Sequence, residues 1–232
     1  MEKFRRFIRY FSAVEWAIWL CSVILIISSF CIFDKSSILT LISPLLGVTS
    51  LIFCAKGNPI GQLLMVIFGL LYGLISLIFG YYGETITYWG MALPTALCAL
   101  ISWLKNPFNG NKAEVKISFI KKWEIGLLSV LAVLVTIGFY FVLKALNTAN
   151  LGVSTFSVLT SFIAAYLAFR RSPYFALAYS VNDIVLIILW GMAAMVDLKY
   201  ISVTVCFIAF LAGDLYGFIN WLRIRKRQSN LA

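Results

Sequence analysis

The chain has 232 residues, of which 62% are hydrophobic and only 12% are charged. A soluble domain is nearer half apolar and a quarter charged, so this composition excludes an ordinary water-soluble fold and indicates a protein of the lipid bilayer. The formal net charge is +10, but the basic residues stand between apolar runs rather than on one solvated face, so nucleic acid is not an expected partner.

Eight apolar runs follow one another along the chain, each near the roughly 20 residues that an α-helix needs to cross a bilayer. They are continuous rather than alternating, which favours helices over a transmembrane β-barrel. The first run follows a basic segment, but it is longer than a signal-peptide core and no cleavage site follows, so we expect it to be retained. The expected spans are 16–33, 38–55, 59–82, 85–104, 123–145, 150–169, 174–196 and 200–222.

Basic residues divide unequally between the two sets of loops. Nearly all of them lie before the first span, in the loops after the second, fourth and sixth spans, or after the last span. The exceptions are Lys35, Lys144 and Lys199. Basic residues near short loops stay in the cytoplasm, so both termini are expected inside. In the longest loop, 105–122, and the residues just after it, the stretch VKISFIKKWEIG is amphipathic enough to lie on the membrane surface.

The two halves of the chain repeat one pattern. A basic turn with a proline (AKGNPIGQ, FRRSPYFA) opens an apolar span, an acidic turn follows (YGET, VDLKY), and the next span closes on ISWLK or INWLR. Each repeat contains three spans, and both repeats start on the same side of the membrane, so one linker span must lie between them. The two repeats are then related by a pseudo-two-fold axis along the membrane normal, as in SWEET-type transporters. The expected fold is an all-α, eight-span bundle of this 3+1+3 type with one extra N-terminal helix. Its parts are 1–37 (N-terminus and extra span), 38–104 (first bundle), 105–149 (basic loop and linker span), 150–222 (second bundle) and 223–232 (basic cytoplasmic tail).

Each of the last two expected spans contains one carboxylate. Asp183 lies in the span 174–196, next to Asn182, and Asp214 lies in the span 200–222. A charge at the bilayer centre costs roughly 2.5–3.5 kcal/mol on insertion scales, so such residues either lock a bundle or face a cavity. Carboxylate, amide and aromatic groups together suit a flat ring that carries a hydroxylated sugar. Helical spacing gathers the candidate contacts of the two spans, which are Tyr179, Asn182, Asp183 and Trp190, then Asp214, Tyr216, Asn220 and Trp221.

The first bundle is poorer in polar groups. Aligned at the basic turns, Gly69 stands opposite Asp183, and aligned at the closing tryptophans, Ala96 stands opposite Asp214. The second bundle is therefore expected to supply most of the chemistry. Gln62, Tyr72 and Trp89 are the candidate contacts of the first bundle, although a packing role explains each of them better than ligand binding does.

The sequence shows no pattern of residues that indicates a metal or cofactor site. There is no histidine, and the five cysteines fall inside apolar spans without a metal-binding spacing. We therefore expect no metal, no cofactor and no histidine-based catalysis. Two rows of small residues are expected to be packing surfaces between helices, namely Ala209, Gly213 and Gly217, and Gly69 and Gly73.

The basic-turn bundles, the Asn182–Asp183 pair in the penultimate span and the ending LYGFINW resemble the PnuC family of bacterial vitamin and nucleoside transporters, from about residue 38 to 223. The resemblance implies a SWEET-like fold in the bacterial cytoplasmic membrane and import of nicotinamide riboside by facilitated diffusion, with a cytoplasmic kinase trapping the product. Family riboside transporters carry a WxxxN motif in this span. Here Asn182 holds the asparagine place, Ala178 holds the tryptophan place and Tyr179 is the nearest aromatic residue.

Several alternatives stay open at this point. The cargo is a ribonucleoside, a deoxyribonucleoside, or another vitamin such as thiamin or riboflavin, and the sequence does not decide between a monomer and a homo-oligomer. A channel is disfavoured because no ring of charges or filter-like loop occurs. An intramembrane aspartyl protease would need two adjacent carboxylates, but Leu211 stands where its GxGD motif needs glycine, and no PAL motif follows. We therefore expect no enzyme.

Overall fold

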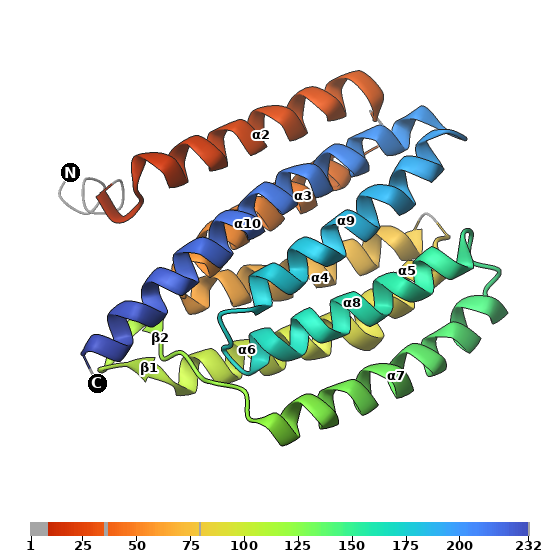
Figure 1. Cartoon of the computed structure of the whole chain (residues 1–232). Coiled ribbons are helices and arrows are strands. Elements are labelled where there is room, and N and C mark those ends of the chain that lie inside the picture. Colours follow the sequence, from red (N-terminus) through yellow and green to blue (C-terminus); the bar gives the residue numbers. More distant parts are fainter. Residues whose placement is uncertain (1–8, 35–36, 79, 232) are drawn as a thin grey trace.

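The computed structural model describes residues 9–34, 37–78 and 80–231. Within them, eight helical segments are long and apolar enough to cross a membrane, which confirms the expected number of spans (Figure 1). Lys3, Arg5, Arg6 and Lys35, which carry part of the orientation argument, lie outside the described residues. The helices are α2 (Ala13–Phe33), α3 (Ile38–Ala55), α4 (Pro59–Ile78), α5 (Tyr82–Thr87), η1 (Tyr88–Ala92), α6 (Leu93–Lys105), α7 (Lys122–Ala145), α8 (Leu151–Phe169), α9 (Phe175–Ala194), η2 (Leu198–Tyr200) and α10 (Ile201–Asn230).

The fourth span is one composite helix made of α5, η1 and α6. The segment η1 is a short π-helical turn, and Pro94 follows it at the start of α6. Proline lacks the N–H that an α-helix needs at this position, and a wider turn lets the helix continue past the missing bond. The sequence predicts this span but not its internal irregularity.

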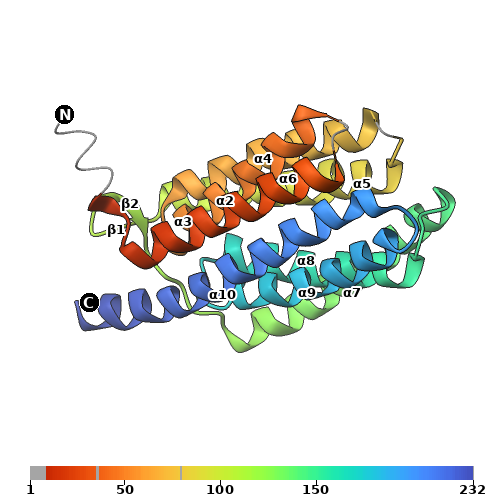
Figure 2. The ribbon, with the colours of Figure 1, turned by 90° about the horizontal axis from the view of Figure 1, so that it is seen from above.

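The two halves of the chain form two layers. Viewed from above, α2 to α6 lie on one side and α7 to α10 on the other (Figure 2). Helix α10 packs against α3, and α6 packs against α8. The last helix of each half therefore contacts the first bundle helix of the other half.

The two basic turns have the same backbone conformation. The residue after the helix is left-handed in both, Gly57 with φ 67 and Arg171 with φ 56. The hydrogen bonds also correspond, with Gly57 N to Cys54 O and Asn58 N to Phe53 O in the first turn, and Arg171 N to Ala168 O and Ser172 N to Leu167 O in the second. This is the Schellman arrangement that ends a helix, and a proline follows because the chain must leave the helix axis there.

The closing tryptophans of the two halves cross over to the opposite half. Trp103 Nε1 donates to Ala168 O, and Trp221 Nε1 donates to Cys54 O, both at 2.8 Å. The two indole rings are fully buried and their centroids lie 5.3 Å apart, with Phe175 packed against both. The repeated motif therefore joins the two halves near the ends of α3 and α8.

The long loop folds back onto the protein instead of lying on the membrane surface. It forms a hairpin of β1 (Pro107–Phe108) and β2 (Asn111–Val115). Val115 and Ile117 are buried beside the tryptophan pair, and the side-chain amide of Gln228 bonds Ile117 N at 2.9 Å and Val115 O at 3.0 Å. The expectation of a surface segment is wrong for these two residues, because backbone pairing and a buried contact give them a better partner than lipid headgroups.

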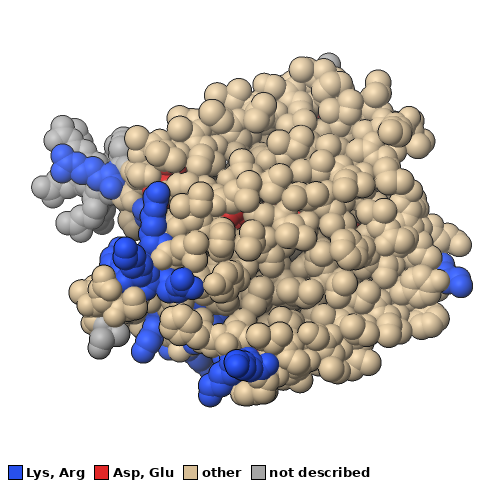
Figure 3. Space-filling model, viewed as in Figure 1, with Lys and Arg blue, Asp and Glu red and all other residues tan. Residues whose placement is uncertain are grey.

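Positive charge gathers at one end of the bundle. Figure 3 shows lysine and arginine at the end that carries both termini, while most of the remaining visible face is free of them. In the described part of the chain, only Lys144 and Lys199 lie at the opposite end. The sides of the bundle expose many large apolar residues, as expected for a surface that faces lipid chains.

Candidate functional site

A partly open cavity lies between the two halves. Helices of both layers line it, and its wall is mostly apolar with a small number of polar groups. Pockets for small molecules typically have this composition. Gly69 and Ala96, which the repeat places opposite the two aspartates, line the same cavity as those aspartates.

Five of the residues predicted from sequence line this cavity, namely Gln62, Tyr179, Asn182, Asp183 and Asp214. Four of them come from α9 and α10, and Gln62 comes from α4. Gln62 is turned partly toward the protein, because its Nε2 lies 3.5 Å from Cys54 Sγ. The second half therefore supplies most of the polar lining of the cavity.

Asp183 and Asp214 face each other across the α9–α10 contact. Their side chains are only 3% and 5% exposed, and they lie within hydrogen-bonding distance of each other. Oδ2 of Asp183 is buried and receives no hydrogen bond from an N–H or O–H group in the part of the chain described. A buried carboxyl without a cation partner is costly, so this pair requires a chemical explanation.

Asn182 is held by the neighbouring helix. Its Oδ1 accepts a hydrogen bond from Thr160 Oγ1 of α8 at 2.8 Å, and the residue is 6% exposed. Because the amide carbonyl is engaged by α8, the amide NH₂ group remains to donate toward the cavity.

Three other predicted contacts lie outside this cavity. Tyr72 and Trp190 line a second cavity near α2, of about 1010 Å³, where the Trp190 ring lies 5.4 Å from that of Tyr200. Trp89 packs over Gly73, and its Nε1 lies 3.4 Å from Leu70 O. The two cavities are neighbours, because Phe68, Glu84 and Phe207 line both.

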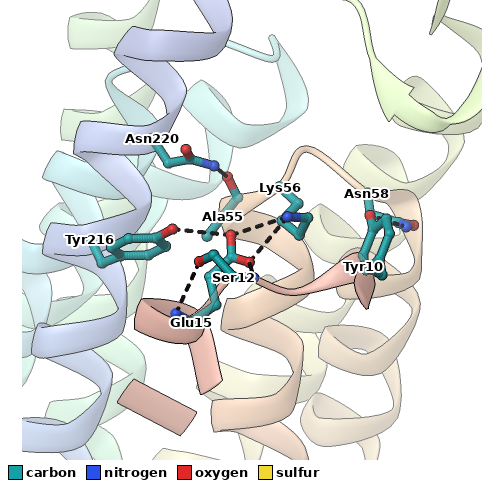
Figure 4. A network of polar contacts seen from close by, with 8 residues as sticks. All are labelled: Tyr10, Ser12, Glu15, Ala55, Lys56, Asn58, Tyr216 and Asn220. Carbon is teal, nitrogen blue, oxygen red and sulfur yellow. Dashed lines mark hydrogen bonds and ion pairs between the residues drawn. The ribbon is translucent and has the colours of Figure 1, made fainter. Parts of the chain in front are cut away.

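The last three predicted contacts are Tyr216, Asn220 and Trp221. They lie toward the end of the bundle that carries the termini, and each bonds to another part of the protein. Tyr216 donates to Glu15 Oε1 at 3.0 Å, and Glu15 also pairs with Lys56 at 3.1 Å (Figure 4). Asn220 Nδ2 donates to Ala55 O at 2.9 Å, in the same view, and Trp221 belongs to the tryptophan pair. These residues tie α10 to α2 and α3 in this structure.

Two groups of lining residues do not emerge from the sequence argument. Ser154, Ser157 and Ser161 on α8 all face the cavity, and their spacing of three and four places them on one helical face. This spacing is visible in the sequence and would have found them. Glu84, expected in an acidic turn between spans, also lines the cavity because α5 begins before it.

Comparisons with known proteins agree on one family. A model of the family described as Nicotinamide mononucleotide transporter matches residues 37–223. The chain is similar to a nicotinamide riboside transporter PnuC of Neisseria mucosa (26% identical over 220 residues, covering 92% of this chain and 82% of that one) and to another of Haemophilus influenzae (25% over 195 residues, 82% and 81%). The crystal structure of a vitamin B3 transporter PnuC has the same fold, with a TM-score of 0.78, 23% identity and 94% of each chain covered.

Proposed function

The chain belongs to the nicotinamide mononucleotide transporter family, and on that premise we propose that it imports nicotinamide riboside or a related ribo- or deoxyribonucleoside. The match confirms the resemblance that the sequence motifs indicate. The observation that carries the proposal is the cavity between the two halves, whose lining includes Asn182 and Asp183 on α9 and Asp214 on α10. The similar proteins of Neisseria mucosa and Haemophilus influenzae are named nicotinamide riboside transporters, which supports the same cargo here.

The proposed contacts are the five predicted residues that line the cavity. The NH₂ group of Asn182 and the carboxyl groups of Asp183 and Asp214 are suited to the hydroxyls of a ribose. The rings of Tyr179 and Tyr88 border the same space and offer apolar faces to a flat base. Tyr179 takes the role that tryptophan has in the WxxxN motif, since Ala178 stands at that place.

We further propose that transport is facilitated diffusion, in which the two three-helix bundles, 38–104 and 150–222, rock around this site and 123–145 links them. The crossed contacts of α10 with α3 and of α6 with α8 support such a movement, because they form the boundary that must rearrange. The termini are placed in the cytoplasm of a bacterial cell, where a kinase traps the imported nucleoside.

Two alternatives are separable from this proposal. Thiamin or riboflavin as cargo would use the same cavity. An intramembrane aspartyl protease needs two carboxyl groups close together, and Asp183 and Asp214 meet that condition. The chain lacks the GxGD and PAL motifs, and its relatives are transporters, so we propose that the pair serves binding rather than hydrolysis.

Calorimetric binding to the purified protein tests the proposal, with a panel of nicotinamide riboside, ribonucleosides, deoxyribonucleosides, thiamin and riboflavin. Thr160→Val removes the hydroxyl that orients Asn182 while keeping the side-chain shape. Loss of one hydrogen bond of about 1 kcal/mol should weaken binding of the preferred ligand roughly fivefold, and Asn182→Ala should weaken it further.

The matched control is Thr155→Val on the same helix. Its hydroxyl donates to Leu151 O within α8 and is not part of the cavity wall, so binding should not change. If no nucleoside in the panel binds the wild-type protein, the proposed substrate class is wrong. If Asn182→Ala binds as tightly as wild type, the proposed site is wrong.

A further inference from the structure

We propose that Asp183 and Asp214 hold one proton between them and release it when a cationic nucleoside enters the cavity. The inference rests on the proposed function, because it concerns the same cavity. It adds two properties that the proposed function does not contain, a preference for positively charged cargo and the release of a proton when that cargo binds.

The first argument is the geometry of the pair. An ionised carboxylate has no hydrogen to donate, so two carboxyl groups that hydrogen-bond each other need a proton on one of them. Asp183 on α9 and Asp214 on α10 lie within hydrogen-bonding distance, and both are almost completely buried. Two adjacent like charges in such surroundings do not ionise together.

The second argument is the surroundings of the pair. The titratable groups that interact electrostatically with Asp183 include Tyr179 on its own helix, Asp214 and Cys206 on α10, and Tyr88 on η1, while Cys54 of α3 interacts with Asp214. Helix α8 contributes hydroxyl groups such as that of Thr160 but no charge at this level. Among the described residues that line the cavity there are three carboxyl groups and no lysine or arginine.

The described lining of the cavity therefore offers no positive charge that would allow the second carboxyl to ionise. A cationic ring placed beside the pair would supply that charge. The O–H bond of the protonated carboxyl then breaks, the proton passes to water or buffer, and the cargo takes over as the counter-charge. No oxidation or reduction is involved. A neutral cargo can accept or donate hydrogen bonds at the same groups and leaves the proton in place.

This exchange has a defined pH dependence. Because binding of the cation releases a proton, the affinity rises with pH, by up to about tenfold per pH unit while the pair still holds its proton. The affinity for a neutral cargo stays flat over the same range. The exchange thus separates cationic from neutral molecules of the same shape, a distinction that hydrogen bonds alone do not make.

The test compares nicotinamide riboside, a pyridinium cation, with its reduced dihydro form, which is uncharged and similar in shape. Binding to the purified full-length chain is measured by calorimetry at one pH in two buffers of different ionisation enthalpy, and again at a higher pH. The expected result is the release of close to one proton with the cation and of none with the reduced form, together with tighter cation binding at the higher pH.

Substitutions of the two aspartates test whether the released proton comes from Asp183 and Asp214. Asp183→Asn and Asp214→Asn keep the side-chain shape, and each should abolish proton release and reduce the preference for the cation at least tenfold. Asp197→Asn, in an exposed turn, should keep both properties of wild type. The buffer comparison on wild-type protein decides the proton count even if one variant does not fold.

The outcomes separate the two proposals. If the cation binds wild type without releasing a proton, or if both forms bind equally at every pH, the inference is overturned and the proposed function stands. If neither form binds while the cationic panel member thiamin does, the riboside cargo is wrong, and proton release with thiamin decides the inference. If only neutral panel members bind, the inferred preference for a cation is overturned. Proton release that persists in both asparagine variants also overturns it.

Discussion

Arg171 occupies a backbone position that favours glycine. Its φ of 56 lies in the left-handed region, and its counterpart in the first turn, Gly57, has φ 67. Burial, and next the positive charge of Arg170, lower the pKa of Arg171, and in the part of the chain described its Nε and Nη1 are buried without a hydrogen-bond partner. The side chain thus adds strain and desolvation to a turn that a glycine forms freely.

We therefore predict that Arg171→Gly stabilises the protein by about 1 kcal/mol, because glycine removes both the left-handed strain and the unpartnered guanidinium. Gly57→Ala should destabilise by a similar amount, since an added Cβ meets only ordinary contacts there and the φ alone is unfavourable. Thermal unfolding of the purified protein measures both. A lower unfolding temperature for Arg171→Gly would show that the guanidinium makes a stabilising contact.

Individual site residues could be predicted in part. Asn182, Asp183 and Asp214 are visible in sequence because polar groups inside an apolar span need a partner, and the structure places all three at one cavity. Tyr216, Asn220 and Trp221 share the same chemistry but bond to other helices. Helical spacing gives the face of a residue but not the neighbour that the face meets, so the sequence could not separate these two groups.

The clearest feature among the elements is the pair of crossed tryptophan bonds. Each indole fills a fully buried site and caps the end of a helix in the opposite half. Replacement by phenylalanine removes the N–H donor and leaves a void where the larger ring stood. Both effects weaken the contact between the halves rather than one helix alone.

We predict that Trp221→Phe and Trp103→Phe each destabilise the purified protein by roughly 1–3 kcal/mol, through the lost hydrogen bond and the void. Trp123→Phe is the control, because Trp123 is 64% exposed on the outside of α7 and should unfold as wild type does. Differential scanning fluorimetry in one detergent compares the three. Equal unfolding temperatures for Trp221→Phe and Trp123→Phe would exclude a structural role for the crossed bond.

The helices were predictable for a simple reason, since a bilayer demands long apolar runs and allows few other structures. The residues at which the helices end were harder to predict. Helix α10 continues to Asn230 because no glycine or proline interrupts the basic segment after Trp221. The hairpin of β1 and β2 was missed because the burial of Val115 depends on a distant side chain, Gln228, which local patterning does not reveal.

At the scale of the whole molecule, α2 and α7 make corresponding ion pairs. Glu15 in the first turn of α2 pairs with Lys56 at the end of α3, and Glu124 in the first turn of α7 pairs with Arg170 at the end of α8. The sequence argument treats one of these spans as extra and the other as a linker. The ion pairs show that each of these spans is joined at its start to the end of the first helix of the bundle that follows it, a likeness that the motifs did not show because the surrounding residues differ.

The end-to-end charge distribution predicts which way the molecule sits. Basic residues gather at the end that carries both termini, and they are retained in the cytoplasm during insertion. A green fluorescent protein fused after Ala232 should therefore fluoresce. Alkaline phosphatase, which folds only outside the cytoplasm, should be active when fused after Asn147 in the α7–α8 loop and inactive after Lys112 in the basic loop.

The two phosphatase fusions are matched, because both interrupt the chain in a loop next to α7 and differ only in the end of the bundle they report. Active phosphatase at the Lys112 junction together with a dark fluorescent fusion would mean the reverse orientation. The cavity between the halves would then have its Trp103–Trp221 end at the outer face. Its end near Glu84 and Thr148 would then face the cytoplasm.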